Sequence, residues 1–298
     1  IRTERHRCFS ASVNHKGVTE MEKRYGLIGE PIEHSLSPAM HNFWFKKSGV
    51  SGDYKAYSVP MQELAETVEG LKAIGIHGFN VTFPHKTAIM PLLDEVSTLA
   101  ETIGAVNTVV QSNGRLIGYN TDGLGFLEGL KAHFPMLATQ KPSVLIIGAG
   151  GAARSVALVL AQAIGSRIDI CNRTFERALI LSESCKKFCT SQALDFAQAE
   201  KQIDQYQIII NTTSLGLYPE TDHPVIKIDG AASNTLFVDL IYRPNRTAFL
   251  KDAERLGYRV MNGLPMLVCQ GAFAFQKWTG VYPDTKIMED YLIRTFLS

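Results

Sequence analysis

Polar side chains follow short apolar runs at four places in the first half of the chain, in the segments HSLSP, NVTFPHK, AVNT and YNTDG. Because open α/β sheets bind their ligands beyond the carboxyl ends of strands, we expect these side chains to surround one crevice. Hydroxyls and amides together with one cation and one carboxylate suit a small polyhydroxylated acid. They do not suit a metal, because no cluster of His, Cys and Asp with ligand spacing accompanies them. The candidate residues are Ser35, Ser37, Asn80, Thr82, Lys86, Asn107, Thr121 and Asp122.

The candidate lysine follows the run GFNVTF, in which apolar and polar residues alternate. This alternation predicts a strand that has Phe79, Val81 and Phe83 in the core and its polar residues facing a ligand. Pro84 ends the run and presets the first turn of a helix, so we expect Lys86 to lie at a helix start. A cation there opposes the helix dipole, which is the kind of local conflict expected at a functional site.

Each of these polar clusters also has a purely structural interpretation. Ser37 precedes a proline, so from the sequence alone helix capping explains it at least as well as binding does. Asn107, Thr121 and Asp122 could be turn and cap residues. Lys86 could be an ordinary surface lysine. No single cluster decides between these interpretations.

A glycine-rich loop begins the second half of the chain. Gly148, Gly150 and Ala153 match the pattern G-x-G-x-x-[GA], after the apolar run SVLII and before an alanine-rich helix that starts near Ala152. Glycines let the backbone approach a pyrophosphate, whose charge then lies at the helix N-terminus. The alternative is a glycine turn that only packs a helix on a sheet, but the strand and the helix that the motif requires are both expected here.

The residues after the next strand indicate which dinucleotide is bound. An NAD-selecting protein carries Asp or Glu there, whereas this chain has Asn172, Arg173 and Thr174, with Arg177 one helical turn later. Two guanidinium groups would pair with a 2′-phosphate that an acid would repel, and the threonine could donate a hydrogen bond to it. This pattern predicts NADP(H), although Arg177 could also be an ordinary solvated helix charge.

Strand-like and helix-like segments alternate from Tyr25 onward, which indicates α/β architecture with mostly parallel sheets. The run AVNTVVQSNGRLIGYN contains Asn113-Gly114 between two strand-like halves and predicts a hairpin, and so an antiparallel edge on the first sheet. A second unit opens with the glycine loop and continues through the apolar runs YQIIINTT, TLFVDLIY and YRVMNG. The segment LPMLVCQGAFAFQKWTG after them has an apolar helical pattern.

Composition limits the classes of function. The chain has 298 residues, 45% of them hydrophobic, and a formal net charge of +1, which fits two ordinary domains and argues against nucleic acid as a partner. No apolar run approaches the roughly 20 residues that span a bilayer. Five cysteines without a CxxC pair favour a reducing compartment, so we predict a cytoplasmic protein. Residues 1–20 have no apolar period, and we interpret them as a leader or extension outside the fold.

Taken together, the motifs identify a family that the chain resembles. The segments SLSPAMHN, FNVTFPHK, GAVNTV, GYNTDG, GAGGAARS, NRT, NTTSLG, DLIYRP and NGLPMLVCQGAFAFQKWTG are similar, in order, to the signatures of the shikimate dehydrogenase family, over essentially all of residues 21–298. The resemblance implies two α/β domains around a cleft, and the reversible NADPH-dependent reduction of 3-dehydroshikimate to shikimate on the route to chorismate and aromatic amino acids. It implies a substrate-binding domain of residues 21–122 plus 267–298 and a Rossmann-like NADP-binding domain of residues 123–266.

The resemblance also implies roles for individual residues. Lys86 and Asp122 would be the catalytic pair, with the lysine as acid and base. The substrate carboxylate would be held by Ser35, Ser37 and Tyr242, and the ring oxygens by Asn80, Thr82, Asn107 and Gln270. The cofactor would bind the loop of Gly148, Ala149, Gly150, Gly151, Ala152 and Ala153, the adenosine-end residues Asn172, Arg173, Thr174, Arg177, Thr213 and Ser214, and the nicotinamide-side residues Ile241, Gly263 and Met266.

Two other hypotheses remain at this point. One is a quinate/shikimate dehydrogenase or a paralogue acting on another small hydroxy acid, and the other is a cofactor-sensing protein that no longer turns over. Both serines of SLSP favour shikimate over quinate, and the presence of Lys86 and Asp122 counts against the sensor. We expect a small-molecule substrate and a monomer or a homodimer.

Overall fold

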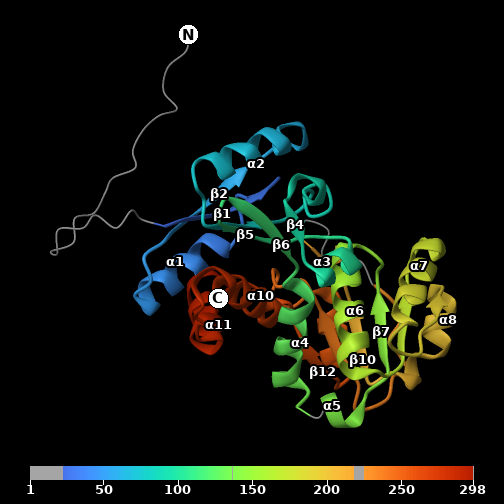
Figure 1. The fold of residues 1–298 in the computed structure, drawn as a ribbon. Coiled ribbons are helices and arrows are strands. Elements are labelled where there is room, and N and C mark those ends of the chain that lie inside the picture. The colour runs from blue at the N-terminus through green and yellow to red at the C-terminus, as the bar shows by residue number, and fades with distance from the viewer. Residues whose placement is uncertain (1–22, 136, 218–224, 298) are drawn as a thin grey trace.

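The computed structural model describes residues 23–135, 137–217 and 225–297. Its described strands form two six-stranded sheets, one above the other in Figure 1, with helices around and between them. The interpretation of residues 1–20 as a leader lies outside the described residues. None of the described helices is long and apolar enough to cross a membrane.

The first sheet is mixed, with the strand order β2-β1-β3-β5-β6-β4. Of its described strands only β5 runs against the others, because it pairs antiparallel with both β3 and β6. The expected hairpin is confirmed, but β5 lies inside the sheet and the short β4 forms the edge, so the prediction of an antiparallel edge was wrong. The strands are β1 (Arg24–Gly29), β2 (Asp53–Ser58), β3 (Gly78–Val81), β4 (Glu95–Val96), β5 (Thr108–Ser112) and β6 (Arg115–Tyr119).

The second sheet is parallel throughout its described strands, in the order β12-β11-β10-β7-β8-β9. Successive residues of its central strands belong to two different core clusters, because helices cover both faces of the sheet. This is the predicted Rossmann-like unit. Its strands are β7 (Val144–Ile147), β8 (Ile168–Cys171), β9 (Ala193–Leu194), β10 (Ile208–Asn211), β11 (Leu236–Asp239) and β12 (Arg259–Met261).

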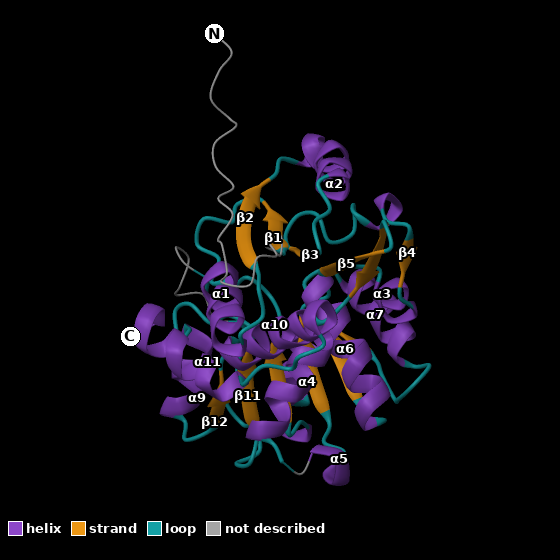
Figure 2. Ribbon diagram, turned by 60° about the vertical axis from the view of Figure 1, so that its left-hand side comes forward, coloured by secondary structure: helices purple, strands orange, loops and turns teal. Residues whose placement is uncertain are grey.

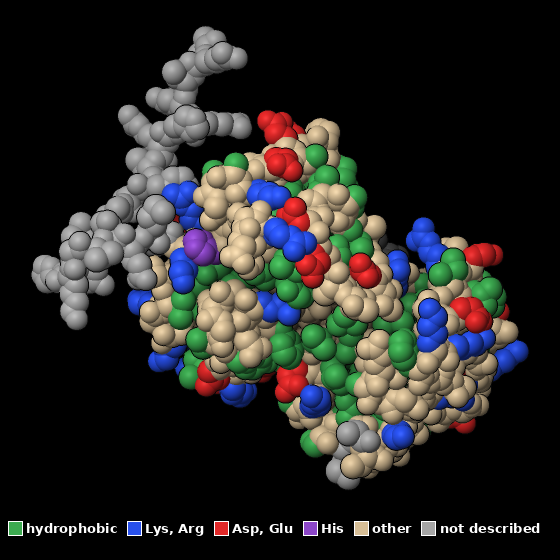
Figure 3. Space-filling model, in the orientation of Figure 1, with side chains coloured by type: hydrophobic (Ala, Val, Ile, Leu, Met, Phe, Trp, Pro, Cys, Tyr) green, Lys and Arg blue, Asp and Glu red, His purple; other side chains and the backbone are tan. Residues whose placement is uncertain are grey.

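Helices and strands alternate along most of the chain, as expected from the sequence. Those of the first half are α1 (Ser37–Ser48), α2 (Leu64–Ala73), α3 (Thr98–Ile103) and α4 (Asp122–His133). Those that follow are α5 (Leu137–Gln140), α6 (Gly151–Ile164), α7 (Phe175–Cys185), α8 (Phe196–Lys201), α9 (Ala248–Arg255), α10 (Leu264–Thr279) and α11 (Thr285–Leu292). On the face drawn in Figure 3, acidic and basic side chains of the described residues are interspersed and form no continuous basic surface.

Helix α4 lies between the two sheets, where it packs against α10 and α6 (Figure 2). Glycines on its first turn allow this close packing. A Cβ atom at Gly123 would overlap the backbone of Ser155 in α6, and one at Gly125 would overlap the backbone of Gln270 in α10. The three helices therefore meet almost backbone to backbone at the start of α4, next to Asp122.

The predicted burial along GFNVTF is correct only as far as the strand continues. Phe79 and Val81 are buried, whereas Phe83 is 72% exposed, so its prediction as a core residue was wrong. The reason is that β3 ends at Val81. Side chains alternate between two faces only in an extended strand, so the pattern does not predict burial in the turn that follows.

The expected helix start at Lys86 was also wrong. Residues 84–89 form consecutive turns, in which the His85 amide donates to the Thr82 carbonyl at 2.9 Å. The Lys86 carbonyl accepts a 2.8 Å bond from the Val106 amide, which ties the turn to the approach to β5. Because no helix begins here, Lys86 does not oppose a helix dipole.

Candidate active site

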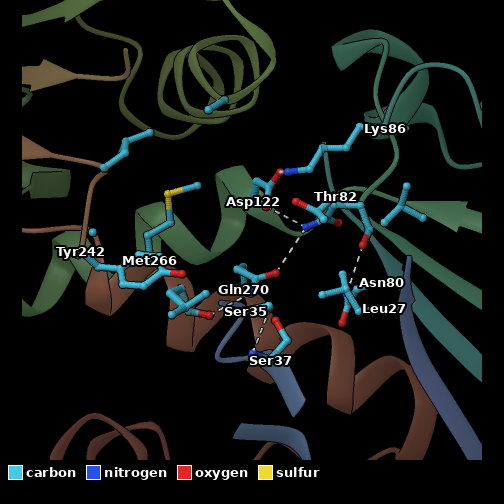
Figure 4. A pocket seen from close by; sticks show the side chains of 16 residues that line it. Leu27, Ser35, Ser37, Asn80, Thr82, Lys86, Asp122, Tyr242, Met266 and Gln270 are labelled. Atoms are coloured by element: carbon cyan, nitrogen blue, oxygen red, sulfur yellow. Dashed lines mark hydrogen bonds and ion pairs between the residues drawn. The ribbon is translucent and has the colours of Figure 1, made fainter. Parts of the chain in front are cut away.

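A pocket of about 270 Å³ lies between the carboxyl ends of the first sheet, the start of α4 and the start of α10 (Figure 4). It brings together every residue to which the family resemblance assigns catalysis or substrate binding, whereas the candidate Thr121 is buried outside the lining and bonded to Asn107. It is lined by Leu27, Ser35, Ser37, Asn80, Val81, Thr82, Lys86, Asn107, Asp122, Ala152, Leu240, Tyr242, Gly263, Met266, Leu267 and Gln270.

The predicted catalytic residues form an ion pair in this pocket. Lys86 Nζ lies 2.6 Å from Asp122 Oδ2, and the side chains are 30% and 9% exposed, respectively. An ammonium group has three N–H donors, so one can serve Asp122 while others remain for a ligand. The pair is therefore partly desolvated and still reachable from the pocket.

Asp122 is held by further hydrogen bonds. Its second carboxylate oxygen, Oδ1, accepts a 2.7 Å bond from Asn107 Nδ2, and its backbone amide donates to Asn120 Oδ1 at 3.1 Å. Asn107 Oδ1 in turn accepts from the Thr121 amide at 2.8 Å. With a separate donor on each oxygen, the carboxylate plane is fixed and Lys86 is held toward the pocket.

The turn that carries Lys86 is anchored by its neighbour. His85 is fully buried, and its Nε2 lies 2.6 Å from the Val59 carbonyl oxygen. The Ile89 amide donates to the His85 carbonyl at 2.9 Å. A fixed His85 beside Lys86 limits how far the base of the lysine side chain can move.

Asn80 is held in place by hydrogen bonds to Tyr54, Asn107 and Thr108. Its Oδ1 accepts a 2.7 Å bond from the Tyr54 hydroxyl, and its Nδ2 donates to the Asn107 carbonyl and to Thr108 Oγ1, each at 3.1 Å. Burial raises the pKa of Tyr54 well above its usual value, so its hydroxyl stays protonated and acts as the donor. Asn42 fixes the Tyr54 backbone through two 2.9 Å bonds.

The two serines of SLSP lie at the start of α1 and line the pocket. The helix begins at Ser37, Leu36 is its N-cap, and no side chain caps it. The cap interpretation of Ser37 is therefore wrong, and this residue is buried in the pocket lining. Ser35 Oγ accepts from the Ser37 amide at 3.3 Å, which keeps the two serines close together.

Gln270 and Tyr242 complete the polar lining from the other side. Gln270 Nε2 donates to the Leu267 carbonyl at 2.8 Å, and its Oε1 accepts from Asn107 Nδ2 at 3.4 Å. Tyr242 is half-buried in the segment after β11, and burial raises the pKa of its hydroxyl. In Figure 4, Tyr242 lies on the side of the pocket opposite Lys86, and Gln270 lies between them.

The glycine loop has the geometry that its sequence predicts. Gly148 has a φ of 115°, and a Cβ there would overlap Thr212 Oγ1, so glycine is required on two counts. Gly150 is the N-cap of α6, and the space beside Gly150 and Gly151 is open. Of the loop residues named from the sequence, only Ala152 also lines the pocket, which places the loop at its rim.

The expected 2′-phosphate residues follow β8. Arg173, Thr174 and Arg177 are exposed, and in the described part of the chain no carboxylate forms an ion pair with either arginine. Asn172 Nδ2 donates to the Thr174 carbonyl at 2.8 Å and shapes the turn into α7. Both guanidinium groups are thus available to an anion from solution.

The residues expected near the nicotinamide are partly in the pocket. Gly263 and Met266 line it, whereas Ile241 is buried outside the lining and its neighbour Leu240 takes that place. A Cβ at Gly263 would overlap the Leu240 carbonyl, so only glycine fits there. Thr213 Oγ1 donates to Asn211 Oδ1 at 2.7 Å, and Ser214 follows it in the same turn.

Several lining or supporting residues were missed from the sequence. Leu27, Val81, Leu240 and Leu267 line the pocket, and Tyr54 supports it from behind. The apolar residues carry no chemical signal, and only Val81 and Leu240 have the hint of a position at a strand end. Tyr54 in β2 reaches Asn80 in β3 across the intervening strand β1, which a local pattern cannot show.

Fold and pocket together define a class of protein, the α/β oxidoreductases that place a Rossmann-like dinucleotide-binding half beside a polar substrate pocket. Family models agree with this class over most of the chain. The shikimate dehydrogenase substrate binding domain matches residues 27–109, the shikimate / quinate 5-dehydrogenase model residues 130–245, and the shikimate 5′-dehydrogenase C-terminal domain residues 263–292.

Relatives and solved structures narrow the class. A shikimate dehydrogenase (NADP(+)) from Geobacillus sp. strain WCH70 is 45% identical over 273 residues, covering 92% of this chain and 98% of the relative. The structure of shikimate 5-dehydrogenase from Thermus thermophilus, in complex with NADP(H) and shikimate, is 39% identical, with a TM-score of 0.82 over 91% of this chain and 99% of that one. Quinate dehydrogenase from Corynebacterium glutamicum, in complex with NAD, is 29% identical with a TM-score of 0.84, over 92% and 99%.

The chain therefore belongs to the shikimate dehydrogenase family.

Proposed function

We propose that this protein catalyses the reversible NADPH-dependent reduction of 3-dehydroshikimate to shikimate, with Lys86 as the acid and base and Asp122 as its partner. The observation that carries the proposal is the 2.6 Å Lys86–Asp122 pair in a polar pocket at the rim of the glycine loop. The relatives support the reaction and the cofactor, because the curated ones are NADP(+)-dependent shikimate dehydrogenases.

The proton chemistry follows from the placement of the lysine. When bound, NADPH supplies the hydride, and the carbonyl carbon that receives it leaves negative charge on its oxygen. The Lys86 ammonium stabilises that charge and then gives its proton to the oxygen, so ketone, hydride and proton together yield the alcohol. In the opposite direction neutral Lys86 takes the hydroxyl proton. Asp122 keeps the Lys86 side chain in position in both directions.

The rest of the lining supports binding of a small hydroxylated acid. We assign the substrate carboxylate to Ser35, Ser37 and Tyr242, which all line the pocket. We assign the ring oxygens to the amides and the hydroxyl on the other elements, namely Asn80, Thr82, Asn107 and Gln270. Asn80 and Asn107 are already bonded within the protein, so they meet the ligand as rigid groups.

We assign the cofactor to the carboxyl ends of the strands in the second sheet. The pyrophosphate would lie on residues 148–153 at the N-terminus of α6, and the 2′-phosphate on Arg173 and Arg177 with Asn172 and Thr174. Thr213 and Ser214 would face the adenine ribose. Ile241, Gly263 and Met266 would face the nicotinamide, two of them from the pocket lining itself.

The proposal also includes the domain boundaries, the cellular compartment and the oligomeric state. Residues 21–122 plus 267–298 form the substrate-binding domain and residues 123–266 the NADP-binding domain. In support, the strands of the first sheet lie between residues 24 and 119 and those of the second between 144 and 261. The described cysteines Cys171, Cys185, Cys189 and Cys269 are free thiols, which supports a cytoplasmic protein. We expect a monomer or a homodimer.

Steady-state assays with shikimate and with quinate, each with NADP+ and with NAD+, test the assignment. We expect shikimate with NADP+ to give the highest kcat/KM. A higher kcat/KM for quinate would show that the chain functions as a quinate dehydrogenase. A preference for NAD+ would contradict the roles given to Arg173 and Arg177.

A further inference from the structure

A buried carboxylate lies next to the pocket but outside its lining. Asp239 ends β11 and is 0% exposed. Its oxygens accept three hydrogen bonds, from Ile241 N at 3.0 Å, from Thr247 Oγ1 at 2.7 Å and from Asn211 Nδ2 at 3.1 Å. No Lys, Arg or His of the described residues pairs with it.

Stability alone does not account for this group. A buried charge without a cation is unfavourable, and burial raises the pKa of Asp239 accordingly. Apolar side chains of similar volume often replace buried ionic groups without loss of stability. The positions of the three donors therefore indicate the role of Asp239 better than its contribution to stability does.

The donors belong to segments that surround the expected cofactor position. Asn211 ends β10 beside Asp239, and its Oδ1 accepts from the Thr213 amide at 3.0 Å. On the other side, the Ile241 carbonyl accepts from the Gly263 amide at 3.1 Å, immediately before α10. One carboxylate thus connects the turns after β10 and β11 with the start of α10.

We propose that Asp239 is a positioning residue for hydride transfer: it holds the turn of Thr213 and the segment that carries Leu240 and Tyr242 in register at the carboxyl end of the second sheet. This inference rests on the proposed function. Asp239 lies outside the pocket lining and acts through Asn211, Ile241 and Thr247. A displacement of reacting groups by about 1 Å can lower a rate by about 100-fold, so such a residue has a measurable effect on catalysis.

The same sheet offers a matched control. Asp169 in β8 is also 0% exposed, and its Oδ2 accepts bonds from Arg167 Nε at 2.6 Å and from the Tyr206 hydroxyl at 2.7 Å. It lies near the amino end of the sheet, at the level of Leu145, away from the pocket. Loss of its carboxylate should lower stability without moving the cofactor segments.

The experiment compares Asp239→Asn with Asp169→Asn in the full-length protein. Whichever way the new amide at position 239 turns, its N–H₂ group faces either the Ile241 amide or Asn211 Nδ2, so one donor meets another. We expect kcat for shikimate oxidation to fall by about tenfold or more in Asp239→Asn. In Asp169→Asn it should stay within about twofold of the wild type, although thermal unfolding occurs at a lower temperature in both variants.

Equal losses of kcat in the two variants, or a folded Asp239→Asn variant with an unchanged kcat, would overturn the positioning role. If Asp239→Asn does not fold, Thr247→Val and Thr247→Ser decide the question, because only the serine keeps the donor. Equal kcat values for that pair would also overturn the role. We expect the serine variant to retain activity and the valine variant to lose it.

The two proposals can fail separately. A wild-type protein without activity on shikimate would overturn the proposed function alone. The positioning role would then be tested by measuring the affinity for NADP+ with titration calorimetry. That affinity should fall at least about fivefold in Asp239→Asn and stay within about twofold in Asp169→Asn. Equal affinities in the two variants would reject the role.

Discussion

Asn107 donates a 2.7 Å hydrogen bond to the carboxylate oxygen of Asp122 that Lys86 does not use. The two oxygens of the Asp122 carboxylate therefore have different roles. One oxygen holds the catalytic ammonium, while the other is held by an amide that is itself fixed to the Thr121 amide. The direction of the lysine is therefore set by a chain of contacts that begins in the approach to β5.

Removing the lysine side chain should abolish most of the activity. We expect Lys86→Ala to lower kcat for shikimate oxidation by about 100-fold or more, the usual scale for loss of a general acid or base. Lys72→Ala, which removes a surface lysine paired with Asp94, should leave kcat unchanged. Steady-state kinetics and a thermal melt of both variants check this. Normal turnover by a folded Lys86→Ala variant would show that another group moves the proton.

Changing Arg173 should affect one dinucleotide more than the other. Its guanidinium is exposed and without a carboxylate partner among the described residues. We expect Arg173→Ala to raise KM for NADP+ by about tenfold or more, while KM for NAD+ changes by less than about twofold, because only NADP+ carries the 2′-phosphate. Arg255→Ala, at a surface arginine of α9, is the control. Parallel changes in both KM values would reject the phosphate contact.

Removing the Tyr54 hydroxyl should weaken substrate binding from outside the pocket. In Tyr54→Phe, Asn80 Oδ1 loses its 2.7 Å donor, and a buried acceptor without a partner costs about 1–3 kcal/mol. We expect stability to fall and KM for shikimate to rise, with KM for NADP+ unchanged. Tyr206→Phe removes a comparable bond to Asp169 and should lower stability alone. If both variants change KM for shikimate equally, Tyr54 does not act through Asn80.

Alanine should have opposite effects on stability at a packed glycine of α4 and at an exposed glycine of α2. Gly125→Ala would overlap the Gln270 backbone and should lower the free energy of unfolding by about 1–3 kcal/mol or more. Gly70 lies on the exposed face of α2 with open space around it, so Gly70→Ala should raise that free energy by about 0.5–1 kcal/mol. Urea denaturation of both variants measures the difference. A Gly125→Ala variant as stable as the wild type would contradict the packing described.

Much of this site could be predicted because its residues occupy strand ends and a glycine loop, and such positions have local signals. The pairing of Lys86 with Asp122 came from the family resemblance, and the structure places the two side chains in contact. The errors arose where a local pattern was extended past its element, as at Phe83 beyond the end of β3. Asp239 and Tyr54 were missed because each has a side-chain partner on another strand, Asn211 and Asn80 respectively, and a single sequence does not show such contacts.

The glycines of α4 also limit how the protein can be redesigned. Gly123 and Gly125 fit α4 against the backbones of α6 and α10, and α6 begins at the glycine loop. A chimaera that exchanges the dinucleotide-binding sheet and its helices, but not α4, with those of a relative would place a foreign α6 against this α4. A chimaera that exchanges this unit must therefore transfer α4, α6 and α10 as one block.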